Sequence, residues 1–349
     1  MINPLASDLD HILSHTYDLW EEVREKQIFI TGGTGFFGCW LLESLIWAND
    51  KLGLNIKALV LTRNYESFRK KAPHLCDHES ISFISGDIAS FKFPEGVFSH
   101  IIHAATEASV KLNQEEPLLM FETIVEGTRR TLEFARVCQA KKFLLVSSGA
   151  VYGKQPPDLI NIHEDYNGAP SSTNPQSAYG EGKRAAEMLC TLYGQKYAFE
   201  TKIARCFAFV GPYLPLDTHF AIGNFIRNGL QSKPILVNGD GTPYRSYLYA
   251  SDLAVWLWTI LFKGRTCHAY NVGSNKAITI AELAYVVANL FACPLDVHIT
   301  KESSLGKQPE RYVPSIQKAS DELHLHPFIQ LDEAIKRTIN FELNSENMD

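Results

Sequence analysis

The chain has 349 residues, 45% of them hydrophobic, and a formal net charge of −6 spread without long runs, which argues against nucleic acid or an anionic membrane as a partner. Its seven cysteines are scattered and form no CxxC pair, so neither a disulfide framework nor a metal site is predicted, and a reducing, cytoplasmic compartment fits best. No apolar run approaches the ~18 residues of a membrane-spanning helix, so no membrane partner is expected.

Residues 1–25 are predicted to form a helical extension before the first strand. Apolar residues between positions 5 and 23 recur near helical spacing. A structural brace packed on the body of the fold explains this pattern more simply than a partner-binding role.

A turn typical of dinucleotide binding follows the extension. Residues 28–31 predict a short buried strand and residues 36–49 an apolar helix, with three glycines spaced three apart between them. Glycine permits a tight turn and lets the backbone approach a pyrophosphate bound at the helix N-terminus. The flanking strand and helix give this otherwise weak motif its value. The residues of the turn expected to contact a cofactor are Gly32, Thr34, Gly35, Phe36, Phe37 and Gly38.

The end of the second predicted strand, IKALVLTRN, bears on the choice of cofactor. In this architecture an acidic residue there binds the ribose hydroxyls, whereas an arginine accommodates a 2′-phosphate. Arg63 has no acidic neighbour before Glu66, which favours NADP(H) over NAD(H). A surface arginine, or one stacked on the adenine, is the alternative.

Two further strands are predicted over residues 81–88 and 99–106, followed by a helix over 117–138. Asp87 is placed to bond the adenine amine, and small residues at the end of the fourth strand let a cofactor lie against the sheet. The expected cofactor contacts from these strands are Asp87, Ile88, Ala104 and Ala105. Alternating strands and helices predict an α/β fold with a doubly wound parallel sheet of Rossmann type.

Three polar side chains are candidates for catalysis. Ser148 ends the apolar run KKFLLVSS, which predicts a buried strand, so its hydroxyl is expected at the carboxyl edge of the sheet. Residues 176–193 predict a helix on which Tyr179 and Lys183 share one face. A lysine cation beside a phenol favours the phenolate, so we expect Tyr179 to move a proton while Ser148 bonds a substrate oxygen. Such a pair is common on helices, and the upstream glycine turn gives it functional weight.

The last third of the chain predicts a smaller, partly interleaved α/β lobe. Glycine and proline become frequent after Pro212, while residues 250–262 are apolar enough to return to the first core, and residues 280–291 predict a further helix. We therefore predict a dinucleotide-binding domain over 26–206, with 245–275 returning to it, and a substrate lobe over 207–244 and 276–349.

Together these segments resemble the extended short-chain dehydrogenase/reductase family, in its nucleotide-sugar epimerase/dehydratase branch. The similarity covers roughly residues 28–320 and rests on TGGTGFFG, GDI, HAAT, SSGAVYG, the Tyr179/Lys183 pair, RCFAFVGPY, GDGTPYRSYLYASDLA and NVGS. It implies hydride exchange between a nicotinamide and C4 of a nucleotide-diphosphate sugar, with Tyr179 as acid/base, Ser148 as its partner and Lys183 on the nicotinamide ribose. It also implies a homodimer paired through the helices over 117–138 and 176–193. The substrate contacts implied are Asn224, Phe225 and two diphosphate clamps, Arg245 and Arg311.

Departures from that pattern narrow the expected reaction. Gly149 and Ala150 stand where dehydrating relatives carry an Asp-Glu pair, and Gly149 also stands where 3,5-epimerases carry a cysteine. Redox at one carbon remains, as in a C4 epimerase, which we slightly favour, or an NADPH-dependent 4-keto-sugar reductase. Ile124 and Ala208 replace usual asparagines, so the relatives' proton relay and phosphate contacts are not carried over unchanged.

Two other functions stay open. A reductase for a non-nucleotide carbonyl compound would not bind nucleoside diphosphates. A dinucleotide-binding scaffold without turnover belongs to another class, and the intact Ser148, Tyr179 and Lys183 argue against it.

Overall fold

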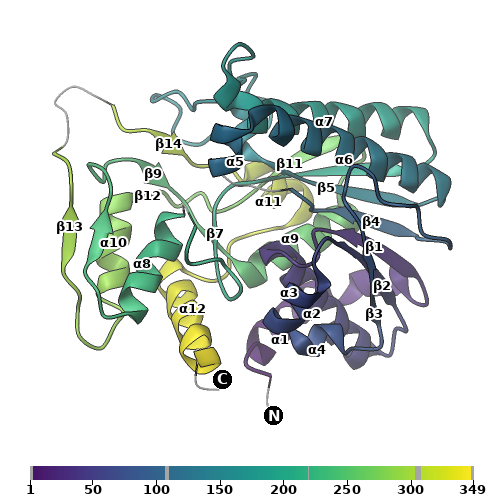
Figure 1. Cartoon of the computed structure of the whole chain (residues 1–349), viewed down its shortest axis with the longest axis horizontal. Helices are drawn as coiled ribbons and strands as arrows, with labels where there is room; N and C mark the ends of the chain where they lie inside the picture. Colours follow the sequence, from purple (N-terminus) through teal and green to yellow (C-terminus); the bar gives the residue numbers. More distant parts are fainter. Residues whose placement is uncertain (1–2, 107–109, 219, 303–307, 347–349) are drawn as a thin grey trace. The chain divides into compact units, whose positions relative to one another are not determined.

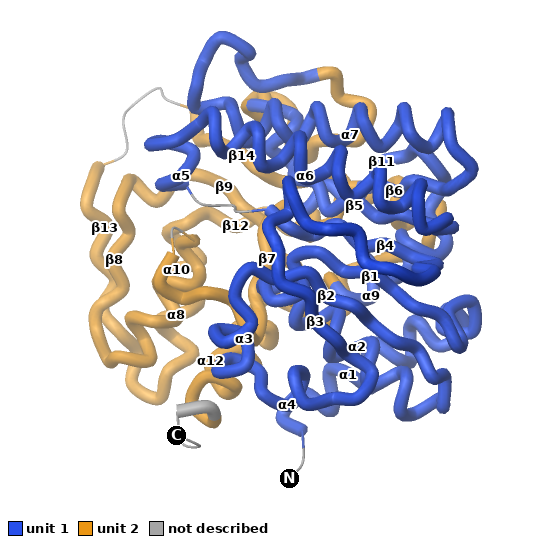
Figure 2. Tube along the Cα trace, turned by 45° about the vertical axis from the view of Figure 1, so that its right-hand side comes forward, with its two compact units in different colours: residues 1–153, 168–206, 254–270 blue, residues 154–167, 207–253, 271–349 orange. Residues whose placement is uncertain are grey.

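The computed structural model of the chain describes residues 3–106, 110–218, 220–302 and 308–346. The chain forms two compact units, coloured separately in Figure 2. Unit 1 comprises residues 1–153, 168–206 and 254–270, and unit 2 comprises residues 154–167, 207–253 and 271–349.

This division differs from the predicted one at three places. The N-terminal extension belongs to unit 1, the returning segment shrinks to 254–270, and residues 154–167 leave the dinucleotide-binding domain for unit 2. The last difference has a physical cause in backbone pairing: Ile162 donates to the carbonyl of Val313 (2.9 Å) and accepts from the amide of Ser315 (2.7 Å). These bonds hold the segment to the C-terminal part of the chain.

A seven-stranded sheet in the order β11-β6-β5-β4-β1-β2-β3 is the centre of unit 1. In chain order its strands are β1 (Gln27–Thr31), β2 (Lys57–Thr62), β3 (Ile81–Ser85), β4 (His100–His103), β5 (Lys142–Ser148), β6 (Glu200–Cys206) and β11 (His268–Val272), the last ending in unit 2. All neighbouring pairs from β3 to β6 are parallel. The predicted doubly wound sheet is confirmed, and its order reverses between β1 and β4, where such sheets bind ligands beyond the carboxyl ends of the strands.

Helices cover both faces of this sheet. Figure 1 shows α6 (Pro117–Val137) and α7 (Ala178–Lys196) on one face and α2 (Phe36–Leu52) on the other. Under α6 and α7, buried apolar side chains of the strands and the two helices form one core, including Phe29, Phe134 and Phe143. The shorter helices of unit 1 are α3 (Tyr65–Lys71), α4 (Pro73–Cys76) and α5 (Val110–Glu115), together with the 3₁₀ turns η2 (Gly149–Tyr152) and η3 (Pro175–Ser177).

The N-terminal extension is part of the core of unit 1. It forms the helix α1 (Ala6–Thr16) and then the 3₁₀ helix η1 (Tyr17–Val23), where one continuous helical pattern is predicted over residues 5–23. Trp20 is fully buried, with its ring centroid 4.7 Å from that of Trp258 on α9 (Ala250–Lys263).

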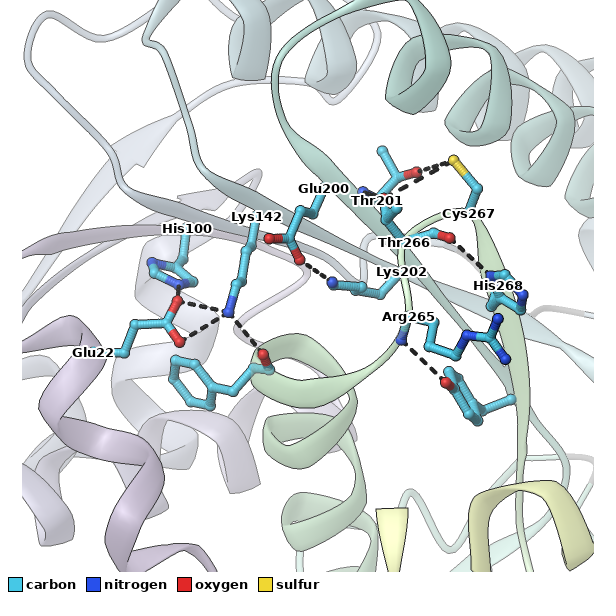
Figure 3. A network of polar contacts seen from close by, with 12 residues as sticks. Glu22, His100, Lys142, Glu200, Thr201, Lys202, Arg265, Thr266, Cys267 and His268 are labelled. Carbon is cyan, nitrogen blue, oxygen red and sulfur yellow. Dashed lines mark hydrogen bonds and ion pairs between the residues drawn. The ribbon is translucent and has the colours of Figure 1, made fainter. Parts of the chain in front are cut away.

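Polar contacts tie the extension to the N-terminal ends of two strands (Figure 3). The carboxylate of Glu22 accepts from Nζ of Lys142 (2.7 Å) and lies 3.1 Å from Nε2 of His100, while Lys142 also donates to the carbonyl of Phe262 (2.7 Å). Burial lowers the pKa of His100 to about 4, so its ring is neutral near pH 7. The extension therefore braces the edge of the sheet opposite the carboxyl ends of the strands.

Unit 2 contains short strands and four helices of its own among the residues described. The helices are α8 (Ala221–Leu230), α10 (Ile280–Ala288), α11 (Gln317–Leu323) and α12 (Leu331–Glu346), and α9 begins here. The strands form the small sheets β10-β7, β12-β9-β14 and β13-β8, from β7 (Phe209–Val210), β8 (Ile235–Val237), β9 (Tyr244–Arg245), β10 (Leu248–Tyr249), β12 (Ile278–Thr279), β13 (Val297–Ile299) and β14 (Arg311–Tyr312). Within the described ranges, no helix has both the length and the apolar character needed to cross a membrane.

Candidate active site

The turn between β1 and α2 is packed so closely at Gly32 and Gly38 that neither position has room for a Cβ. Gly32 has φ +71°, and a Cβ there would lie 2.5 Å from the carbonyl carbon of Ala104. A Cβ on Gly38 would lie 2.3 Å from Cα of Gly33, so the first turn of α2 rests directly on backbone. At Gly35 the nearest atom would be 3.4 Å away, so packing does not require glycine at that member of the predicted triplet.

The third sterically required glycine is Gly33, which the spacing pattern missed. A Cβ at Gly33 would lie 2.7 Å from Cγ1 of Val60 on the neighbouring strand β2. The Gly-Gly dipeptide at the end of the strand could have indicated this position. The reason for glycine there, however, is a contact with Val60, which is 27 residues later in the chain.

The N-terminus of α2 is suited to an anion. Gly35 is its N-cap residue and supplies no side-chain cap, and the amide of Gly35 donates to the carbonyl of Gly32 (3.1 Å). The first N–H groups of an α-helix have no intrahelical acceptor, and the helix dipole favours negative charge there. Because the backbone at Gly35 is uncrowded, the pyrophosphate of a dinucleotide has room to bind at this helix N-terminus. Thr34, Phe36 and Phe37 lie in this same turn, half-buried.

The predicted adenosine contacts lie at the carboxyl edge of β2 and β3. Arg63 directly follows β2 and is exposed, and Asp87 follows β3, with its Oδ1 accepting from the amide of Ala89 (2.9 Å). The side chain of Ile88 is buried, within 2.9 Å of the position that a Cβ on Gly127 of α6 would occupy. We therefore expect any cofactor contact of Ile88 to be made mainly by its backbone.

The end of β4 is pinned beside the glycine turn. The amide of Ala104 donates to the carbonyl of Thr31 (3.1 Å), and the amide of Ala105 donates to the Thr31 hydroxyl (3.2 Å). The same hydroxyl lies 2.8 Å from Nδ1 of His103. Burial lowers the pKa of His103 to about 3, so this imidazole is a neutral structural link.

Ser148, Tyr179 and Lys183 come together at the carboxyl end of β5. Ser148 is hydrogen-bonded to the Tyr179 phenol, and its Oγ accepts from the amide of Ala150 (3.2 Å). Lys183 lies one turn after Tyr179 on α7, with Nζ 6.0 Å from the centroid of the phenol ring. A hydroxyl, a phenol and an ammonium group thus share one small region at the edge where β1 and β4 also end.

The protonation of Tyr179 differs from the expectation that Lys183 acidifies it. Burial raises the pKa of the phenol above its ordinary value, and the hydrogen bond with Ser148 opposes that rise. The ammonium of Lys183 instead donates to Oγ1 of Thr106 and to the carbonyl of Val146, each at 2.7 Å. Burial lowers the pKa of Lys183 to about 8. In the protein alone the phenol is therefore protonated at neutral pH.

A buried ionic network lies beside these residues. Glu187 accepts from the hydroxyl of Ser147 (2.6 Å) and from Nη2 of Arg205 (2.7 Å), and Nη1 of Arg205 donates to the Tyr152 hydroxyl (2.8 Å). Burial alone would lower the pKa of Arg205, but its bonds with Glu187 raise it, so the guanidinium is charged. The network joins β5, α7, β6 and η2. Sequence reasoning missed it, although Glu187 follows Lys183 by four residues on one helix face.

Comparison with known proteins identifies the family. The model of the NAD dependent epimerase/dehydratase family matches residues 28–273. The chain belongs to this family. UDP-glucuronic acid decarboxylase 1 of Danio rerio is 30% identical over 321 residues, which cover 92% of this chain and 73% of that protein. UDP-glucuronic acid decarboxylase 6 of Arabidopsis thaliana is 30% identical over 309 residues, covering 88% and 86% of the two chains.

Solved structures agree with the family in fold. An epimerase from Methanothermobacter thermautotrophicus has a TM-score of 0.79 at 22% identity, covering 96% of this chain and 97% of its own. The UDP-glucuronic acid 4-epimerase from Bacillus cereus, solved with UDP-glucuronic acid and NAD, has a TM-score of 0.77 at 21% identity, covering 91% and 99%. The resemblance drawn from the sequence motifs is confirmed, and the chain is a member of an NAD-dependent enzyme family.

The two arginines that the family resemblance suggests as diphosphate clamps lie on β9 and β14 of unit 2. In this parallel pair Arg245 is opposite Tyr312 and Arg311 is opposite Tyr244. The Arg311 guanidinium lies 4.3 Å from the Tyr244 ring centroid, and that of Arg245 lies 6.0 Å from the Tyr312 centroid. Successive residues of a strand point to opposite faces, so the two arginines leave the pair on opposite sides instead of forming one fork.

The other two substrate contacts suggested for this family member lie on α8. Phe225 is only 2% exposed and packs in the core of unit 2, so its side chain cannot contact a nucleotide in this conformation. Asn224 is half-buried, and its Nδ2 donates to the carbonyl of Thr218 (2.8 Å). The segment that the family resemblance suggests as a nucleotide contact, HFAIGNF, begins at His219, which lies outside the described residues.

Proposed function

We propose that this family member oxidises and re-reduces C4 of a nucleotide-diphosphate sugar, acting as an epimerase. The observation that carries the proposal is the hydrogen-bonded Ser148–Tyr179 pair with Lys183 one helical turn away, at the same sheet edge as the glycine turn. A nicotinamide dinucleotide supplies the hydride acceptor and donor for such chemistry. Exposed Arg63 at the end of β2 favours NADP(H) for this role.

Tyr179 is the proposed acid/base. It takes the proton of the C4 hydroxyl as that carbon becomes a ketone and returns it when the ketone is reduced, while the Ser148 hydroxyl bonds the same oxygen. Because burial raises the pKa of Tyr179, the phenol is a ready proton donor to the ketone, and the oxidation step needs positive charge close to it. Gly149 and Ala150 carry no proton-transferring group, which disfavours a 4,6-dehydratase.

For the substrate we propose contacts from Asn224, Arg245 and Arg311, and from the backbone of Phe225. A guanidinium meets phosphate oxygens bidentately, and each arginine is already oriented by a tyrosine ring. Because they leave the β9–β14 pair on opposite faces, the two are expected to contribute separately to diphosphate binding.

A decarboxylase is the second candidate, favoured by the UDP-glucuronic acid decarboxylase of Danio rerio that is 30% identical over 92% of this chain. A ketone at C4 weakens the bond to a carboxylate on C5, because the electrons left behind delocalise onto the ketone oxygen. The same Tyr179-assisted oxidation would therefore start either reaction. A 4-keto-sugar reductase shares the residues but consumes one reduced dinucleotide in each turnover.

Product analysis distinguishes these reactions. The protein is incubated with UDP- and dTDP-hexoses of both C4 configurations and with UDP-glucuronic acid, each with NAD⁺, NADP⁺ or NADPH. We expect interconversion of C4 epimers without net cofactor consumption and a larger thermal shift with NADPH than with NADH. Release of CO₂ would indicate the decarboxylase, and stoichiometric NADPH oxidation the reductase. No turnover and no thermal shift with any nucleoside diphosphate would contradict all three.

We also infer that the protein is a homodimer paired through α6 and α7. Figure 1 shows the two helices side by side, and large apolar side chains on them face solvent. They are Leu118 and Leu119 on α6 and Met188 and Leu192 on α7. A second copy of the same surface would cover them.

Light scattering tests the dimer. Twice 39.2 kDa, or 78.4 kDa, is expected for the wild type and 39.2 kDa for Leu192→Glu. Val97→Glu is the matched control, because Val97 is equally apolar and 71% exposed but lies in the loop before β4. A monomeric wild type, or a Leu192→Glu protein that keeps the dimer mass, would contradict this interface.

A further inference from the structure

Ile124 on α6 packs against Gly182, the residue before Lys183, and brings no polar group to this part of α7. Ile124, which replaces the asparagine of relatives, is 2% exposed, and its Cδ1 lies 3.2 Å from the position of a Cβ on Gly182. An isoleucine neither donates nor accepts a hydrogen bond. The side-chain group that bonds Lys183 comes from outside α6 and α7.

That group is Thr106, two residues beyond the contact between Gly32 and Ala104. An ammonium has three donors, and Lys183 directs two of them to the Thr106 hydroxyl and the Val146 carbonyl, each at 2.7 Å. The Thr106 hydroxyl donates its hydrogen bond to the carbonyl of Ala105 (2.7 Å), so its lone pairs accept from the lysine. With two N–H directions fixed, tetrahedral geometry fixes the third.

Thr106 is itself anchored to the cofactor side of the sheet. The amide of the preceding residue, Ala105, donates to the Thr31 hydroxyl (3.2 Å) at the end of β1, where the glycine turn begins. The Val146 carbonyl is backbone of β5 and is present whatever the side chain. The Thr106 hydroxyl is therefore the one replaceable contact of the two that orient the ammonium.

We propose that Thr106 is the positioning residue for Lys183: its hydroxyl, with the Val146 carbonyl, sets the direction in which the remaining N–H of Lys183 serves a bound dinucleotide. The role rests on the proposed function, because it presumes that Lys183 contacts the cofactor. Thr106 acts through the lysine and not on the sugar. An acceptor beside the ammonium also favours its charged form, which burial opposes in Lys183.

Two measurements on Thr106→Val test this role, with Thr106→Ser to restore the hydroxyl. Fluorescence titration with NADH and NADPH is expected to give about tenfold weaker binding for the valine variant, as expected for losing part of a charged hydrogen bond, and near wild-type affinity for serine. The second measurement is a pH titration of the Lys183 Cε signal by ¹³C NMR, with the signal assigned by comparison with Lys183→Met. The pKa of Lys183, which burial lowers to about 8, is expected to fall further in the valine variant only.

Thr131→Val is the matched control. Thr131 is a fully buried threonine whose hydroxyl donates to the carbonyl of Gly127 within α6 (2.8 Å), so neither readout is expected to change. An unchanged Lys183 titration in Thr106→Val overturns the positioning role even if the enzyme turns over as proposed. A changed titration with no dinucleotide binding by the wild type would instead overturn the proposed function and, with it, the purpose assigned to Thr106.

Discussion

Replacing Tyr179 by phenylalanine is expected to lower kcat by about 10²–10⁴-fold, the contribution typical of a general acid/base. The ring is half-buried against the core beneath α6 and α7, and phenylalanine keeps that packing. The variant lacks only the phenol oxygen, which is hydrogen-bonded to Ser148 and is proposed to carry the C4 hydroxyl proton. Steady-state kinetics on the substrate found by product analysis measures the effect, and cofactor affinity is expected to stay within a few-fold of the wild type.

Tyr193→Phe controls for the loss of a phenol on the same helix. Tyr193 also lies on α7, but its hydroxyl donates to Glu133 of α6, and burial together with that carboxylate raises the pKa of Tyr193 to about 12. This variant is expected to keep wild-type kcat. A Tyr179→Phe protein that turned over at the wild-type rate would show that another group moves the proton, and the assignment of the acid/base would be wrong.

The parts of the site that the sequence predicted are those fixed by local patterns. The run before Ser148 is apolar and continuous because β5 is buried on both faces, so the end of the strand is visible without the structure. Tyr179 and Lys183 share a face because of the helix period alone. The strand–glycine–helix order around Gly32 likewise belongs to one continuous segment.

The parts that the sequence did not predict depend on contacts between distant segments. Lys183 is held by Thr106, 77 residues earlier, so its effect on Tyr179 could not be inferred from their spacing on the helix. The opposite faces of Arg245 and Arg311 follow from the register of two very short strands, β9 and β14, which no local pattern specifies. Helical periodicity alone does not show whether the side chain of Phe225 faces a ligand or the core, and the structure buries it in the core.

Gly38→Ala is expected to destabilise the protein strongly and to abolish dinucleotide binding. The new Cβ would lie 2.3 Å from both Cα and C of Gly33 and 2.4 Å from the carbonyl oxygen of Gly32. These are backbone atoms, so no side-chain rotation relieves the clash, and α2 must move away from the turn. Overpacking costs typically 1–3 kcal/mol and occasionally more, and we expect a loss of about 3 kcal/mol or more in the free energy of unfolding.

Gly35→Ala separates the packing role of the turn from its binding role. Gly35 has φ −82° and ψ −176°, which alanine adopts freely, and its Cβ would meet no atom closer than 3.4 Å. Stability without ligand is therefore expected to stay within about 1 kcal/mol of the wild type, while affinity for NADPH or NADH falls because the methyl group occupies the approach of the pyrophosphate to α2. Denaturant unfolding without ligand and fluorescence titration with dinucleotide measure the two effects independently. Equal loss of stability in both variants would contradict the packing argument, and undiminished binding by Gly35→Ala would place the pyrophosphate elsewhere than at the start of α2.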